Sequence, residues 1–152
     1  MEDWMINERM MKVLVQTLQE GNHSLVIAQS HSAECLKFDG RGVFDLFRLL
    51  HEEPDVLEGA LLADKIVGKG AAALMTLGKV KEVYADIISE SAFSLLEQEG
   101  IRTTYGKLVP HIINRAGTGM CPVEARCQPC KTPAECLVQI KAFLEEMKAK
   151  NN

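Results

Sequence analysis

The sequence predicts an α/β domain in which an at least partly parallel sheet packs between helices. Short apolar segments alternate with helical segments from residue 59 onward, a pattern typical of strand–helix–strand crossover units. Two further β-rich segments lie close together between residues 24 and 38, as in a hairpin. With 152 residues, 47% of them hydrophobic, the chain can bury one core of its own. We expect a single domain over residues 1–152, with an ordered core at about 8–148 and no linker.

The elements of the first third follow from periodicity and turn residues. Residues 5–18 carry apolar side chains at helical spacing, which predicts a helix. Residues 24–29 and 33–38 have strand character, and the short turn between them favours a hairpin. The glycine-containing segment 39–42 predicts a turn. Residues 43–50 then have an apolar face at helical spacing and predict a short helix.

The rest of the chain alternates between strands and helices. Residues 59–63 form an apolar run too short for a lone helix, so we expect a buried strand there. Asp64 is expected to cap a helix over 65–77 that Gly78 ends. The elements after it are expected to be a strand over 80–88, a helix capped by Ser89 or Ser91 that reaches Glu97, a strand over 103–109, and a helix over 133–148 capped by Thr132.

Charge and hydropathy exclude some classes of protein. A net charge of −4 and a pI near 5.6 argue against a general nucleic-acid binder, which usually carries a basic face, but not against a nucleotide ligand. The first residues are acidic and amphipathic, unlike a signal peptide. No apolar run reaches the roughly 18 residues that a membrane span needs. We therefore expect a cytoplasmic protein with no membrane partner.

The first candidate site lies at the junction of the strand over 59–63 and the helix after it. A helix N-terminus offers unpaired N–H groups to an anion, and Asp64, Lys65 and Lys69 lie at this junction. Four residues apart, the two lysines would share one helix face. Gly68 and Gly70 would let a ligand or another backbone come close. The alternative is a capped helix with solvated lysines and glycines that permit tight packing.

The second candidate site is the polar, glycine-rich turn before Cys121. A cysteine at the start of a short helix has its thiolate stabilised by the helix dipole, so Cys121 is a candidate nucleophile. Glu124, three residues later, is a candidate proton acceptor or orienting group. The alternative is an inert, buried cysteine in a tight turn. The candidate ligand contacts in the turn are Asn114, Arg115, Thr118 and Gly119.

Four of the five cysteines lie close together near the C-terminus. Cys121, Cys127, Cys130 and Cys136 have the spacing Cys-x5-Cys-x2-Cys-x5-Cys. Cytoplasmic thiols stay reduced, so clustered cysteines indicate a metal site or reactivity more often than structural disulfides. A tetrahedral zinc site is one interpretation, although the spacing is compact for two zinc knuckles. A redox pair of Cys127 and Cys130 is another, without the strand-then-helix start of a thioredoxin fold.

Two segments together carry a resemblance to a known family. Residues 62–74 (LADKIVGKGAAAL) and 114–124 (NRAGTGMCPVE) look like an uncharacterised prokaryotic domain-of-unknown-function family, over about residues 8–148. The resemblance implies a cytidine-deaminase-like fold, a three-layer α/β/α sandwich around a mixed sheet. It also implies that Cys121 and Glu124 belong to the family motif, whereas the other three clustered cysteines are additions in this sequence.

The same resemblance implies that the deaminase zinc site is absent. A zinc deaminase needs His/Cys-x-Glu and Pro-Cys-x-x-Cys at the starts of two helices. The matching positions here are expected at residues 64–66 and 89–91, which contain neither histidine nor cysteine. Hydrolytic deamination by a zinc-bound water is therefore not expected.

These observations lead to one main hypothesis and two alternatives. We expect a small-molecule site for an anionic or nucleotide-like ligand at the C-terminal strand ends, with Ser89 among its contacts and no cofactor. If the protein is an enzyme, Cys121 is the expected nucleophile and Lys65 the electrostatic stabiliser or amine nucleophile. The alternatives are a non-catalytic binding or regulatory module and a protein with a structural zinc site. Apolar residues near Trp4 and Met5 could dock on a second copy, so the sequence also allows a homodimer.

Overall fold

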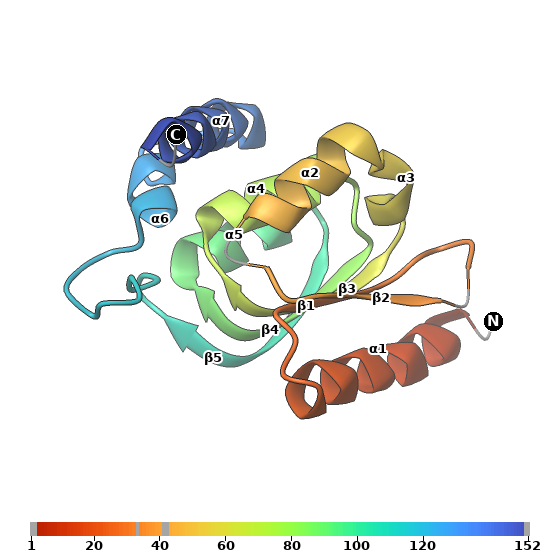
Figure 1. The fold of residues 1–152 in the computed structure, drawn as a ribbon. Helices are drawn as coiled ribbons and strands as arrows, with labels where there is room; N and C mark the ends of the chain where they lie inside the picture. Colours follow the sequence, from red (N-terminus) through yellow and green to blue (C-terminus); the bar gives the residue numbers. More distant parts are fainter. Residues whose placement is uncertain (1–2, 33, 41–42, 151–152) are drawn as a thin grey trace.

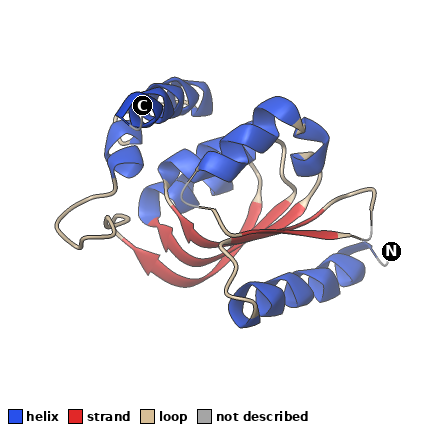
Figure 2. Ribbon diagram, in the orientation of Figure 1, coloured by secondary structure: helices blue, strands red, loops and turns tan. Residues whose placement is uncertain are grey.

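A five-stranded mixed sheet forms the middle of the molecule. The structure, a computed structural model, describes residues 3–32, 34–40 and 43–150. The strand order is β2-β1-β3-β4-β5, and Figures 1 and 2 show the sheet between helices on both sides. The strands are β1 (Leu25–Ala28), β2 (Cys35–Phe38), β3 (Leu61–Val67), β4 (Glu82–Ser89) and β5 (Arg102–Val109).

The sheet combines a hairpin with a parallel half. β1 pairs antiparallel with both β2 and β3, so the predicted hairpin is confirmed. β3, β4 and β5 pair in parallel, which confirms the predicted crossover units. A parallel arrangement places the carboxyl ends of the three strands at one edge of the sheet, where the helices that follow β3 and β4 begin.

Helices cover the two faces of the sheet unequally. Of the elements that the structure describes, helix α1 (Asp3–Glu20) alone packs on one face, mainly against β1 and β3. The opposite face carries α2 (Phe44–Glu52), α3 (Pro54–Leu57), α4 (Lys69–Leu77) and α5 (Glu90–Gln98). The short helix α6 (Pro122–Cys127) and the long α7 (Pro133–Lys150) pack on α4.

Two hydrophobic cores follow from this arrangement. The larger lies between the sheet and α2, α4 and α5, and includes Leu62, Leu74 and Ile88. The smaller lies under α1 and is formed by Met11, Leu14, Leu18, Val26, Ala28, Leu61 and Ala63. β5 takes little part in either core: six of its eight residues are exposed, and Thr103 and Val109 are only half-buried.

The predicted start of the helix after the first parallel strand is wrong. Residues 64–67 continue β3, and the helix begins at Lys69 with Gly68 as its N-cap. The Lys65 N–H donates to the Ser24 carbonyl, so the ladder with β1 extends past Asp64. Ile66 and Val67 are β-branched and fit a strand, and Gly68 is the residue at which the chain changes conformation.

The other predicted elements differ from the structure mainly at their ends. The Ser89 hydroxyl accepts a hydrogen bond from the Ala92 N–H and caps α5, as expected. The Thr132 hydroxyl accepts one from the Glu135 N–H at the start of α7. The predicted turn at 39–42 lies partly outside the described residues, because 41–42 are not described.

Two further expectations concern residues that the structure does not describe. Residue 33, the expected first residue of the second strand, is not described, and neither is the side chain of Trp4.

Within the described ranges, no helix has both the length and the apolar character that crossing a membrane requires.

Candidate functional site

A buried carboxylate lies where the parallel strands end. Glu124, in α6, is 1% exposed. Its Oε1 accepts hydrogen bonds from the Lys69 N–H (2.8 Å) and the Ser89 hydroxyl (3.2 Å). Its Oε2 accepts one from the Ile112 N–H (2.7 Å). One side chain therefore joins the start of α4, the end of β4 and the segment that follows β5.

This carboxylate occupies the position where sequence analysis expects a ligand anion. The first N–H groups of a helix have no partner within the helix and attract negative charge. At α4 the protein supplies that charge itself, through Glu124. Among the described residues, the Cys121 thiol is not a hydrogen-bond partner of Glu124, whose three bonds are to Lys69, Ser89 and Ile112. The geometry gives Glu124 an anchoring role.

The two lysines of the first candidate site do not share a helix face. Lys65 lies in β3, and its Nζ donates to the Asn22 Oδ1 (2.7 Å), just after α1. Lys69 begins α4, and its Nζ donates to the carbonyl oxygens of Gln128 (3.0 Å) and Cys130 (2.6 Å). Because Lys65 belongs to the strand and Lys69 to the helix, the spacing of four residues does not put them on one helix face. Lys69 instead satisfies carbonyl groups at the end of α6.

Asp64 is a buried strand residue and does not cap a helix. It is 8% exposed, and its Oδ1 accepts a hydrogen bond of 3.4 Å from the Ile66 N–H. Burial raises the pKa of this carboxyl group to about 8, and the negative charges of Asp86 and Asp45 act in the same direction. Backbone N–H groups of Ile66 and Lys65 partly oppose the shift. Near neutral pH the side chain is therefore mainly protonated.

The turn before Cys121 is closed by its own hydrogen bonds. The Asn114 side chain accepts from the Thr118 N–H (3.0 Å) and donates to the Thr118 hydroxyl (3.1 Å). The Asn114 N–H donates to the Gly119 carbonyl (2.8 Å), and the Cys121 N–H donates to the Ile112 carbonyl (2.8 Å). Asn114 and Thr118 thus bind each other. Arg115 and Gly119 are exposed, and Cys121 is half-buried at the N-cap of α6.

A groove lies elsewhere, between α1 and the face of β4 and β5 that α1 leaves uncovered. Its volume is about 940 Å³, within the roughly 300–1,000 Å³ of ligand pockets. It lies towards the amino-terminal ends of β4 and β5, away from Glu124 and the strand ends. The residues that line it are Asn7, Glu8, Met11, Lys12, Val15, Gln16, Gln19, Glu20, Lys81, Glu82, Tyr84, Gly100, Arg102 and Thr104.

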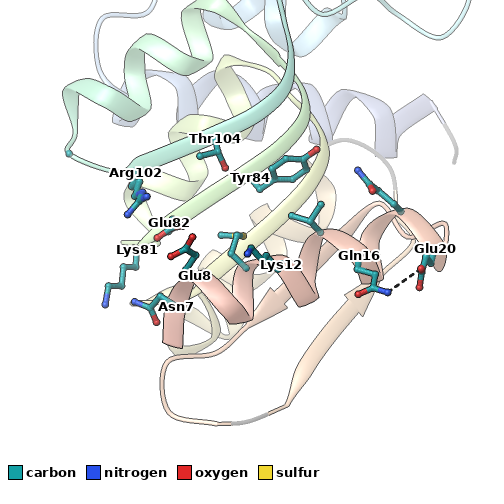
Figure 3. Close-up of a pocket in the computed structure, with 14 residues that line it drawn as sticks. Asn7, Glu8, Lys12, Gln16, Glu20, Lys81, Glu82, Tyr84, Arg102 and Thr104 are labelled. Atoms are coloured by element: carbon teal, nitrogen blue, oxygen red, sulfur yellow. Dashed lines mark hydrogen bonds between the residues drawn. The ribbon is translucent and has the colours of Figure 1, made fainter. Parts of the chain in front are cut away.

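Charged side chains gather at one end of this groove. Figure 3 shows Arg102, Lys81, Glu82 and Glu8 close together there, with Tyr84 nearer the middle. Within the part of the chain that the structure describes, the ion pairs involve other residues, so Arg102 and Lys81 are not held by a carboxylate.

Tyr84 has a fixed position on the sheet side of the groove. Its hydroxyl donates to the Asp86 Oδ1 (2.9 Å), which also accepts from the Gln19 Nε2 (3.2 Å) of α1. Burial and the hydrogen bond to Asp86 raise the pKa of Tyr84, so its hydroxyl stays protonated at neutral pH. The groove therefore combines an aromatic ring held in place with free cationic groups.

The sequence of residues 13–144 matches a protein family described as "Domain of unknown function (DUF1893)". The chain belongs to the DUF1893 family. A solved structure of a DUF1893 family protein from Thermotoga maritima resembles it with a TM-score of 0.78 and 23% sequence identity, over 87% of this chain and 88% of that one. At this identity the likeness shows a common fold. No curated protein matches the chain.

In this DUF1893 chain, three of the four clustered cysteines lie together. Cys127 and Cys136 are completely buried and Cys130 is half-buried, and all are free thiols. Across the described residues, no group of three or more histidine, cysteine, aspartate or glutamate side chains has the arrangement of a metal site. The geometry thus gives no support to the zinc alternative at Cys121, Cys127, Cys130 and Cys136.

The groove of this DUF1893 protein is not apparent from its sequence. Its lining comes from α1 and from β4 and β5 with the residues just before them, and α1 is far from the two strands in the sequence. Most lining residues are of polar types that are common on any surface. One signal was present: Glu82, Tyr84 and Asp86 alternate with buried residues in β4, which indicates a polar sheet face. The predicted residues at the strand ends were brought together only in part, at Lys69, Ser89 and Glu124.

Proposed function

We propose that this chain is a small-molecule binding protein with a cytidine-deaminase-like sandwich and no deaminase zinc centre. Its ligand is anionic or nucleotide-like, and it binds in the groove between α1 and strands β4 and β5. The observation that carries the proposal is the position of Tyr84 and Arg102 in one groove of about 940 Å³. An aromatic ring can stack on a planar base, and a guanidinium can bind a phosphate or carboxylate through two hydrogen bonds.

The absence of zinc chemistry is supported by the residues that begin the helices. The helices that follow β3 and β4 start at Gly68-Lys69-Gly70 and Ser89-Glu90-Ser91, and α2 starts at Phe44. None of these positions holds the histidine or cysteine of a zinc deaminase. The correction to the start of α4 moves the comparison from 64–66 to 68–70 and leads to the same conclusion.

A binding experiment tests the groove directly. Nucleoside monophosphates, the matching nucleosides and inorganic phosphate are titrated while the melting temperature and heat of binding are measured. A monophosphate is expected to bind and to raise the melting temperature in proportion to its occupancy. Better binding of the monophosphate than of both its parts would support a site with a stacking and an anionic component.

Variants locate the binding site. Arg102→Ala is expected to weaken monophosphate binding about tenfold or more, because a charge-assisted hydrogen bond contributes roughly 1.5–3 kcal/mol. Lys107→Ala is the matched control, because Lys107 is an exposed cation on the same strand outside the groove. If no compound of the panel binds, or if both variants bind as the parent does, the groove is not the site.

Chemistry at Cys121 is the second candidate. Cys121 is half-buried and follows an exposed turn, so a small molecule can reach its thiol. A covalent acyl or sulfur transfer would use it as the nucleophile, with Lys65 as the sequence-based candidate for electrostatic support. Cys121→Ala should abolish turnover of any converted ligand, whereas Cys35→Ala, at another half-buried cysteine, should not. A ligand recovered unchanged would favour the non-catalytic, regulatory alternative.

The remaining expectations concern the cellular location and the oligomeric state of the protein. We place it in the cytoplasm, where its five free thiols would stay reduced. A homodimer remains a proposal; Met5 and Ile6, 38% and 59% exposed, are candidates for its interface. Sedimentation of the protein across a range of concentrations would detect the dimer.

A further inference from the structure

The fold concentrates three thiols at the junction of α6 and α7. Cys127 is the last residue of α6, Cys130 lies in the turn, and Cys136 lies in the first turns of α7. Cys127 and Cys130 lie close enough to Cys136 for hydrogen bonding by their thiols to lower the pKa of Cys136. The Cys130 N–H donates to the Cys127 carbonyl (3.0 Å), which tightens the turn.

The three thiols differ in their access to solvent. Cys127 and Cys136 are 0% exposed, and the Cys127 Sγ packs near Gly70 of α4. Cys130 is only half-buried, with its Sγ 3.7 Å from the Arg126 carbonyl oxygen. A dissolved reagent can therefore meet Cys130 first, and the neighbouring Cys136 is buried. Such a pair of an exposed and a resolving cysteine is typical of thiols that exchange disulfides.

The surroundings favour a thiolate within the cluster. Hydrogen bonds from Cys127 and Cys130 and the positive charge of Lys69 lower the pKa of Cys136 to about 7, against opposing effects of burial and Glu135. Burial raises the pKa of Cys130. The hydrogen bond to Cys136, together with burial, raises that of Cys127. Lys69 is held in place by its bonds to the Gln128 and Cys130 carbonyl groups.

We propose that Cys130 and Cys136 form a reversible disulfide by exchange with a low-molecular-weight disulfide, linking the turn after α6 to the start of α7. Cys130 passes its proton to the Cys136 thiolate and attacks one sulfur of the external disulfide, whose S–S bond breaks to release one thiolate. Cys136 then loses that proton, attacks the Cys130 sulfur and displaces the second thiolate. The two cysteines are oxidised by two electrons, and the external disulfide is reduced to two thiols once each thiolate takes up a proton.

The position of this pair connects oxidation to the strand ends. Cys130 supplies a carbonyl that binds Lys69, and Lys69 also supplies the N–H that binds Glu124. A disulfide at Cys130 would fix the turn that carries this carbonyl. The modification would therefore act on the same contacts that hold α6 against α4, independently of the groove beside α1.

The test uses the whole, fully reduced protein and buffers of oxidised and reduced glutathione at set ratios. After equilibration and acid quenching, free thiols are counted under denaturing conditions and the protein is mapped by trypsin and mass spectrometry. Cleavage after Arg126, Lys131 and Lys141 separates residues 127–131 from residues 132–141. The expected result is a fall from five free thiols to three, with these two peptides joined and no glutathione retained.

Variants assign the bond within the cluster. Cys127→Ala should still form the linked peptides, and so should Cys121→Ala, the control outside the cluster. Cys130→Ala should not form them, and Cys130→Ser replaces it if the alanine variant does not fold by circular dichroism. The proposal is overturned if all five thiols persist at the most oxidising ratio, if glutathione stays attached to Cys130, or if the peptides still join without Cys130.

Discussion

Two carboxyl groups show how strongly the surroundings of a single residue decide its role. Glu124 and Asp64 are both buried, but Glu124 accepts three hydrogen bonds of 2.7–3.2 Å, whereas Asp64 accepts a weaker one of 3.4 Å. The donors around Glu124 come from segments far away in the sequence, so no local pattern predicts its anchoring role. For Asp64 the dominant influence is burial, which favours the neutral form.

Asp64→Asn should flatten the dependence of stability on pH. The pKa of Asp64 is about 8 in the folded protein against an ordinary value of 3.8, so between these values the folded state holds a proton that the unfolded state has released. Stability from this group is thus greatest at low pH and decreases as pH rises from about 4 to about 8. Asparagine has no proton to lose, so this decrease should disappear. Urea unfolding between about pH 5 and about pH 9 measures it.

The control for this prediction is Asp55→Asn, because Asp55 is exposed in α3. That variant should keep the pH dependence of the parent protein. An Asp64→Asn variant whose unfolding free energy changes with pH as steeply as that of the parent would show that Asp64 is not the group responsible.

At the scale of elements, the start of α4 shows what local sequence can and cannot specify. The apolar run, the lysines and the two glycines correctly predict a strand-to-helix junction in this region. They do not place the boundary, because Asp64 is a good capping residue. Only the pairing with β4, which reaches Ile66 and Val67, extends the strand to Val67. Where the hydrophobic periodicity is long, as in α1 and α7, the sequence predicts the helices with only their ends displaced.

Gly70 of α4 should be sensitive to the smallest possible enlargement. A Cβ built at this residue would lie 2.5 Å from the Val123 Cγ1 of α6, and a valine side chain has little rotational freedom. Alanine favours a helix by up to about 1 kcal/mol, but overpacking a core contact costs about 1–3 kcal/mol. We expect Gly70→Ala to lower the free energy of unfolding by about 1–2 kcal/mol, measured by urea denaturation.

A second substitution separates the clash from other effects. Val123→Ala removes the Cγ1 that the new Cβ meets, so Gly70→Ala should be less harmful in that background, as a double-mutant cycle measures. Gly119→Ala is the matched control, since no atom lies within 4 Å of a Cβ built there. Equal losses at Gly70 and Gly119, or no coupling between Gly70 and Val123, would contradict the packing argument.

At the scale of the whole molecule, the fold class was predictable and the groove was not. The alternation of strands and helices is recorded along the chain, and the crossover rule converts it into a parallel sheet. The groove exists because α1 covers β1 and β3 and leaves the face of β4 and β5 open. That offset is set by how α1 packs as a unit, through Leu14 and Leu18, and no single segment encodes it.

The unequal cores predict that α1 opens before the rest of the protein. Its cluster has far fewer buried side chains than the one beneath α2, α4 and α5, and the free energy of local opening follows the apolar area that holds an element. Native-state hydrogen exchange should therefore give lower opening free energies for α1 than for β4. Leu14→Ala, at a fully buried residue of the smaller core, should lower the value for α1 by about 2–5 kcal/mol or to the limit of detection. Leu74→Ala, its counterpart in the larger core, should lower the value for β4. Identical opening free energies for α1 and β4 in the parent protein would instead mean that the two faces of the sheet unfold together. The groove would then be lost only when the whole protein unfolds.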